Sequence, residues 1–174
     1  MHSFTELVYR SARFTLNGLR VIQDRVVEEL QTSAATHLVK TLQMIQLQKA
    51  IMAVGMFSIF GSIVQDRLNC DDGFAVVRKH LEREGMDDLV KRFSQFFCAI
   101  NVLKHGRGRS YDALLAQRDE LPFRMKGPDE KFFFEGDVSE ISTLIEVDDR
   151  FVLRCAEVIR EVSDALSKTL GRAM

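Results

Sequence analysis

The chain has 174 residues, a formal net charge of −1 and an apolar fraction of 46%. This composition excludes an intrinsically disordered chain. It also excludes a global electrostatic field that would draw the protein onto nucleic acid or an acidic membrane, although a local basic patch is compatible with it. The length fits a single domain over residues 1–174.

The three cysteines are far apart in the sequence and odd in number: Cys70, Cys98 and Cys155. They match neither a disulfide framework nor a zinc site, and no cofactor-binding motif is present. We therefore expect reduced thiols in a cytoplasmic protein that holds no metal and no other cofactor. Residues 1–13 lack a basic region followed by an apolar core, so we expect no secretory signal there.

Two long helices are predicted in the first part of the chain. In the first, residues 4–31, apolar side chains recur at spacings of three or four: Leu19, Ile22, Val26 and Leu30. The second helix, residues 34–68, begins amphipathic and becomes apolar nearly all round. We expect the two helices to form an antiparallel hairpin, with the second at the centre of a bundle or in a dimer interface.

The most apolar run of the chain, residues 50–64, is about four residues short of the roughly 18 to 20 that a membrane span needs. It continues a longer helix with polar residues on both sides. We therefore expect a buried core helix and no membrane insertion. Its small side chains form a stripe on which another helix can pack closely: Gly55, Ser58, Gly61 and Ser62.

Shorter elements follow the hairpin. After a turn, residues 74–84 are predicted to form a short helix that ends at Gly85. The next helix runs to His105 and has phenylalanines and other apolar residues on one side. Ser110 is then expected to cap a short helix that extends to Gln117.

The composition changes in residues 121–147, which contain both prolines. Residues 132–134 and 141–147 suit short strands, so we predict a small β-hairpin or an irregular insertion here, followed by a last helix. The predicted fold class is all-α: a helical bundle of four long helices plus short helices, with this insertion before the last helix.

Residues 101–111, with the sequence NVLKHGRGRSY, concentrate polar and basic side chains around two glycines. Asn101 and His105 are four residues apart and therefore share one face of a helix. His105 can transfer a proton because the unperturbed pKa of histidine is close to neutrality, which makes it the candidate catalytic residue.

Lys104, Arg107 and Arg109 bring positive charge to the same helix end. Such a cluster can bind a phosphate, and Tyr111 can stack on a base, so these residues and Asn101 are the candidate binding residues. A second interpretation needs no ligand. Lysine and histidine are favoured in a last helical turn, glycine commonly ends a helix, and loop arginines are usually solvated.

The stretch from Ile100 to Gly106 resembles the Arg-Asn-x-x-x-His-Gly motif of HEPN-domain proteins. These are helical bundles of toxin–antitoxin and phage-defence systems, many of which cleave RNA without a metal. Asn101, His105 and Gly106 match the motif, whereas Ile100 replaces the family's arginine, which stabilises negative charge at the phosphate. The resemblance implies a member that binds and does not cleave, unless Arg107 or Arg109 substitutes in space.

Three functional hypotheses follow. The first is a HEPN-like module, forming a homodimer, that binds RNA or a partner protein in a defence or stress setting. The second is a metal-free ribonuclease that uses His105. The third is a structural or interaction protein that works through a helical surface, with residues 101–111 serving only as a cap and a loop.

Overall fold

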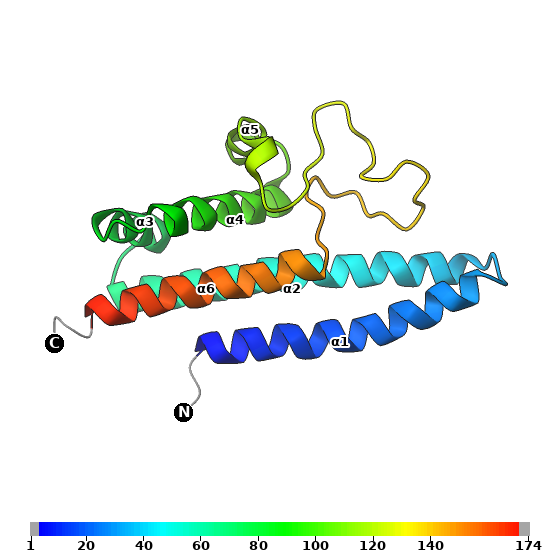
Figure 1. The fold of residues 1–174 in the computed structure, drawn as a ribbon, viewed down its shortest axis with the longest axis horizontal. Helices are drawn as coiled ribbons and strands as arrows, with labels where there is room; N and C mark the ends of the chain where they lie inside the picture. Colours follow the sequence, from blue (N-terminus) through cyan, green and yellow to red (C-terminus); the bar gives the residue numbers. More distant parts are fainter. Residues whose placement is uncertain (1–3, 171–174) are drawn as a thin grey trace.

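A computed structural model describes residues 4–170 and shows a bundle of α-helices with one non-helical excursion (Figure 1). Four of its helices are long: α1 (Phe4–Leu30), α2 (Thr36–Leu68), α4 (Asp87–His105) and α6 (Asp149–Leu170). The prediction of an all-α protein is therefore confirmed. Shorter elements complete the described chain: α3 (Gly73–Arg83), α5 (Arg109–Leu115) and the 3-10 helix Arg118–Glu120.

The first two helices form the predicted antiparallel hairpin, and α6 packs along them (Figure 1). α2 begins at Thr36, after Ala35, and has no side-chain cap at that end. It ends at Leu68 and is followed by Asn69, whose φ of 47° places it in the left-handed region that asparagine tolerates better than most residues.

The buried side of α1 differs in part from the predicted one. Val8, Ala12 and Leu16 follow one another at four-residue spacing and are buried, as is Val26. Ile22, which we expected on the same face, is 47% exposed. The difference arises because α1 has two apolar sides and only one of them faces α2 and α6.

α2 is also buried on one side only. It is the one helix of the described chain that is long and apolar enough to cross a membrane, and 44% of its most apolar window is buried. Phe57 and Phe60 lie in the core, whereas Met44, Ile51 and Ile59 are exposed. One face of α2 is therefore buried in the core, as expected, whereas no element of the described chain covers the opposite face.

A cluster of phenylalanines joins α2, α3 and α4. The ring of Phe74 lies 4.8 Å from that of Phe97 and 5.6 Å from that of Phe93, measured between centroids. The tilted geometry of these pairs suits aromatic rings, which avoid direct face-to-face stacking. Asp72 fixes the start of α3, because its carboxylate accepts a hydrogen bond from the Ala75 N–H at 2.9 Å.

The predicted stripe of small residues on α2 is divided between two environments. A Cβ atom added to Gly61 would lie 2.9 Å from the Phe74 ring, so this glycine lets α3 approach closely. A Cβ atom added to Gly55 would meet nothing within 4 Å. Ser58 and Ser62 are exposed. The close helix contact that we expected therefore forms at Gly61 alone.

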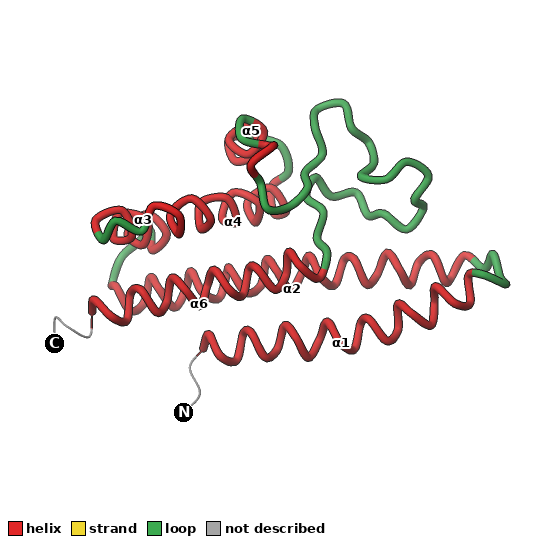
Figure 2. Tube along the Cα trace, viewed as in Figure 1, coloured by secondary structure: helices red, strands yellow, loops and turns green. Residues whose placement is uncertain are grey.

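The predicted strands are absent from the described residues. Between the 3-10 helix and α6 the chain forms an irregular insertion (Figure 2) with one isolated antiparallel bridge, between Met125 and Ile145. Of the two predicted alternatives, the irregular insertion is found and the β-hairpin is not, for a specific reason. The backbone N–H groups of Phe133 and Phe134 donate to the carboxylate of Glu140 and not to a neighbouring strand.

The two glycines of α2 provide a matched test of this packing. Gly55→Ala is expected to raise the free energy of unfolding by about 0.5 to 1 kcal/mol, because alanine favours a helix interior and meets no neighbour. Gly61→Ala is expected to lower it by about 1 kcal/mol, because overpacking against Phe74 outweighs the same gain in helix propensity. Urea unfolding measures both, and equal stabilisation by the two variants would contradict the close α2–α3 contact.

Candidate functional site

The predicted site begins where α4 ends. Gly106 has a φ of +73°, which glycine adopts without the strain that a Cβ atom would bring, and its N–H still donates to Val102 O at 2.8 Å. The chain then turns through Gly108 into α5. Residues 104–109 contain all the predicted basic residues, and we call them the basic segment.

The basic segment borders an open concavity on the protein surface. Asn101 and His105, one turn apart on α4, line it together with Arg107 and Arg109. The structure therefore brings four of the six predicted site residues to one place. Lys104 lies beside His105 in the sequence but does not line the concavity.

Three side chains of the basic segment, two of them cationic, have no side-chain partner within the described chain. Lys104, His105 and Arg109 are exposed and make no side-chain hydrogen bond or ion pair with another described residue. Arg92 shows the contrast, because Asp88 and Glu161 hold its guanidinium at 2.8 and 2.7 Å. The basic segment thus presents positive charge that no described acidic residue neutralises.

Arg107 has a different role, because it ties the basic segment to the insertion. Its Nη2 donates to the backbone oxygen of Pro128 at 2.7 Å, and its guanidinium lies 5.6 Å from the centroid of the Tyr111 ring. A cation over an aromatic face is a favourable contact. Arg107 therefore fixes the conformation of the loop that carries Arg109.

Tyr111 is not available to stack on a base, which corrects the sequence prediction. Its side chain is 3% exposed, and its hydroxyl donates to the backbone oxygen of Lys126 at 3.0 Å. Tyr111 and Leu114 are three residues apart and both buried, so they form the inner side of α5. That spacing was the signal in the sequence that could have placed Tyr111 in the core.

Ser110 is also placed differently from the prediction. α5 begins at Arg109, after Gly108, so Ser110 lies inside the helix and is not its cap. Its hydroxyl is hydrogen-bonded to the thiol of Cys98 on α4. Burial raises the pKa of that thiol, and the hydrogen bond only partly offsets the effect.

The position that carries arginine in the HEPN motif is Ile100, and it is 3% exposed in the hydrophobic core. α4 turns this position away from solvent, so a charged side chain here would have to be buried. Arg107 also lines the concavity but is bound to the insertion, which leaves Arg109 as the guanidinium beside His105 that has no partner in the described chain. No described residue forms a hydrogen bond that would orient the His105 ring.

The insertion is built around one buried ion pair. Lys126 is 4% exposed, and its Nζ lies 3.1 Å from the carboxylate of Glu140. The same Nζ lies 4.4 Å from the centroid of the Phe133 ring. The backbone of Lys126 donates to Leu144 O at 2.9 Å and accepts from Tyr111, so this residue joins both arms of the insertion to α5.

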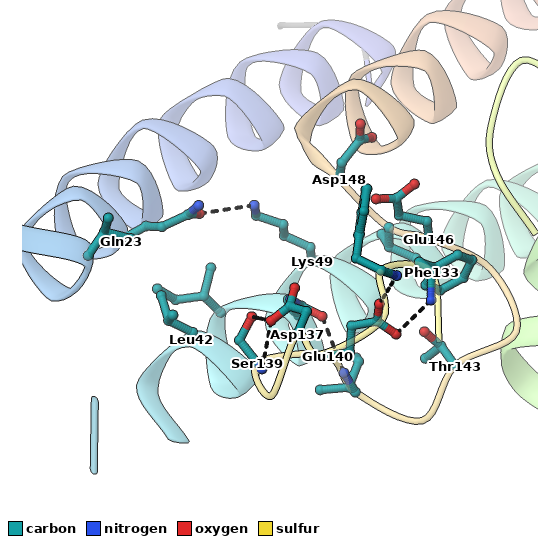
Figure 3. A pocket seen from close by; sticks show the side chains of 16 residues that line it. Gln23, Leu42, Lys49, Phe133, Asp137, Ser139, Glu140, Thr143, Glu146 and Asp148 are labelled. Atoms are coloured by element: carbon teal, nitrogen blue, oxygen red, sulfur yellow. Dashed lines mark hydrogen bonds between the residues drawn. The ribbon is translucent and has the colours of Figure 1, made fainter. Parts of the chain in front are cut away.

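Glu140 organises the tip of the insertion (Figure 3). Its carboxylate accepts the N–H groups of Phe133 and Phe134 at 3.0 and 2.6 Å. Burial raises the pKa of Glu140, but these two hydrogen bonds and Lys126 outweigh it, so the net pKa is lowered. The ionised carboxylate is therefore the form that holds the insertion together.

A second ion pair joins α1, α2 and α6. Lys49 is 8% exposed and reaches Asp149 at 2.7 Å, and Arg20 donates to the same carboxylate at 2.8 Å. Burial raises the pKa of Asp149, whereas hydrogen bonds from Lys49 and Arg20 lower it more, so the net pKa is lowered. This cluster fixes the N-terminus of α6 against the hairpin.

A cleft of about 310 Å³ separates the hairpin from the insertion (Figure 3). Lys49 and Glu140 line it, but their charges are already paired within the protein. Glu146 also lines it, and burial raises the pKa of this carboxyl group. Most of the charged groups in the cleft thus stabilise its walls by pairing with other residues of the protein, so their position is explained without a ligand.

The polar residues that build this region, including Lys49, Lys126 and Glu140, were not predicted from the sequence. One signal was available for Lys49. It is the only charged residue between Lys40 and Asp66, within a helix that is otherwise uncharged over that length. Within residues 4–170, no three His, Cys, Asp or Glu side chains are grouped so that they could hold a metal ion.

Comparison with known proteins identifies no family. No family model, no curated protein and no solved structure matches the chain. The resemblance of residues 100–106 to the HEPN motif therefore depends on those residues alone.

The buried Lys126–Glu140 pair can be tested against an exposed pair of the same chemistry. Lys126→Met is expected to lower the free energy of unfolding by about 3 kcal/mol, because it leaves a buried carboxylate without its cation. Lys91→Met breaks a pair with Glu120 whose side chains are more than half exposed, so it is expected to cost less than about 1 kcal/mol. Similar losses in urea unfolding would contradict the assigned role of Lys126.

Proposed function

We propose that the protein is a non-enzymatic binding module that holds the phosphate backbone of RNA at its basic segment. The observation that carries this proposal is the accessibility of Lys104 and Arg109, whose charges meet no acidic partner among the described residues, on either side of the exposed His105. Cationic side chains that converge on a backbone phosphate replace its counterions, which is the main source of affinity for nucleic acid. The HEPN resemblance of Asn101, His105 and Gly106 favours RNA as the polyanion.

The shape of the loop suits a phosphate ligand. Cβ atoms added to Gly106 and Gly108 would meet nothing within 4 Å, so a ligand can approach the backbone between the basic side chains. Arg107 holds the loop in place through Pro128. A loop whose conformation is already fixed loses less entropy on binding than a mobile one.

Binding is favoured over cleavage by two observations at the concavity. Ile100 lies in the core, so the position of the motif arginine supplies no charge to a reacting phosphate. His105 has no described hydrogen-bond partner that would set the orientation of its ring. A general base normally depends on such a partner, and phosphate transition states depend on a nearby cation.

The proposal predicts that Lys104→Ala combined with Arg109→Ala weakens binding of a short single-stranded RNA at least tenfold in low salt. Removing two phosphate contacts should also flatten the plot of log affinity against log salt by about 1.4, at roughly 0.7 per contact. Fluorescence anisotropy with an end-labelled RNA measures both quantities. Lys131→Ala combined with Arg150→Ala is the matched control, because it removes two exposed charges elsewhere and is expected to keep most of the affinity.

Two results would contradict the proposal. The first is an equal loss of affinity in the two double variants, which would show that only overall charge matters. The second concerns the RNA recovered from the assay, which is expected to be intact. Shortened RNA that appears with the native protein and disappears with His105→Ala would replace the binding module with a ribonuclease.

A further inference from the structure

The α1–α2 hairpin carries two rows of large apolar side chains on its outer surface. Each member is more than half exposed: Leu7, Phe14 and Val21 on α1, and Met44, Ile51 and Ile59 on α2. The α1 row repeats every seven residues, which is close to two helical turns, so its members lie along one line. Large exposed apolar side chains that repeat along one side of a helix are typical of a contact surface, whereas singly scattered ones need no explanation.

The α1 row lies on a side of the helix that α6 does not cover. Arg20 contacts Asp149 of α6, and Arg160 of α6 lies 5.4 Å from the centroid of the Tyr9 ring. Successive residues of a helix are rotated by about 100°, so Phe14 points about a third of a turn away from both Arg20 and Tyr9, which contact α6. α6 therefore covers one flank of α1 and leaves this row open.

The same holds for the exposed row of α2. Phe57 and Phe60 face the core, and Gly61 faces the Phe74 ring of α3. Met44 and Ile51 lie on the remaining side, where no described element covers them. The two rows thus lie on the sides of α1 and α2 that the rest of the described chain leaves uncovered, and we call these six residues together the hairpin face.

We propose that the hairpin face binds a second copy of this chain, with the two α1 helices packed antiparallel about a two-fold axis. Phe14 is the most exposed large apolar residue of the described chain, at 83%, and it projects one turn before Gly18. A Cβ atom added to Gly18 would meet nothing within 4 Å, so the helix surface is hollow beside the ring. Under two-fold symmetry, Phe14 of each copy lies over Gly18 of the other.

The charges along α1 select a second copy in the antiparallel direction. Residues 4–14 have two arginines and one glutamate, a net charge of +1. Residues 21–30 have three acidic residues and one arginine, a net charge of −2. Antiparallel packing places opposite charges next to each other at both ends of the contact, whereas parallel packing opposes like charges.

The apolar area also fits a dimer. Six side chains with these exposures present on the order of 700 Å² per copy, near the roughly 800 Å² that each partner contributes to a standard interface. A lipid surface fits less well, because the acidic end of α1 would be held against the headgroups. The hairpin face lies on elements other than α4 and α5, so self-association does not depend on RNA binding.

Light scattering on the eluting protein tests the proposal. At about 100 μM the native chain is expected to have twice the mass of the 19.9 kDa monomer. Phe14→Asp is expected to raise the dimer dissociation constant at least about 100-fold, because it places a charge at the centre of the interface. Phe132→Asp is the control, since Phe132 is 53% exposed on the insertion, and it should leave the mass unchanged.

A second variant separates the interface from the fold. Gly18→Leu adds a good helix former at a position with no intramolecular neighbour, so it should stabilise the single chain and yet weaken the dimer by filling the hollow. A native mass of one chain, or equal effects of Phe14→Asp and Phe132→Asp, would overturn the proposal. So would a single chain that floats with phosphatidylcholine vesicles through Phe14, which would assign the face to lipid.

Discussion

Lys126 is the residue on which the arrangement of the insertion and the basic segment depends. Its ammonium group is buried against Glu140, and Glu140 in turn fixes two backbone N–H groups at the tip of the insertion. Its backbone oxygen accepts a hydrogen bond from the hydroxyl of Tyr111. The guanidinium of Arg107 lies over the ring of the same tyrosine. A buried charge needs a full set of partners, and here those partners come from every part of the insertion.

The basic segment and the hairpin face lie on different elements, and each presents side chains that no contact within the described chain covers or pairs. The first presents unpaired positive charge, and the second presents apolar surface beside Phe14. Packing two copies through their α1 helices would leave both basic segments free. One RNA that reached both would bind more tightly than to either alone, because the second contact becomes intramolecular.

The helices could be predicted from the sequence because their periodicity and terminal residues are local signals. Gly106 ends α4 at the expected residue for a backbone reason that needs no distant partner. The position of the insertion was predicted from its composition, but its internal structure was not, because the side chain of Glu140 satisfies N–H groups six and seven residues away and so replaces a strand. Tyr111 appeared to be a surface ligand because its partner, Lys126, comes from a distant loop. The exposure of Phe14 was equally hidden, since a helix with two apolar sides does not reveal which one is covered.

The central functional claim is that RNA phosphate contacts the turn between α4 and α5. Amide chemical shifts of the native protein, followed during titration with a short single-stranded RNA, test it most directly. We expect the largest changes at Gly106, Gly108 and Arg109, with small changes along α1 and α2. Changes centred on the cleft beside Lys49, or no changes at low salt, would contradict the claim.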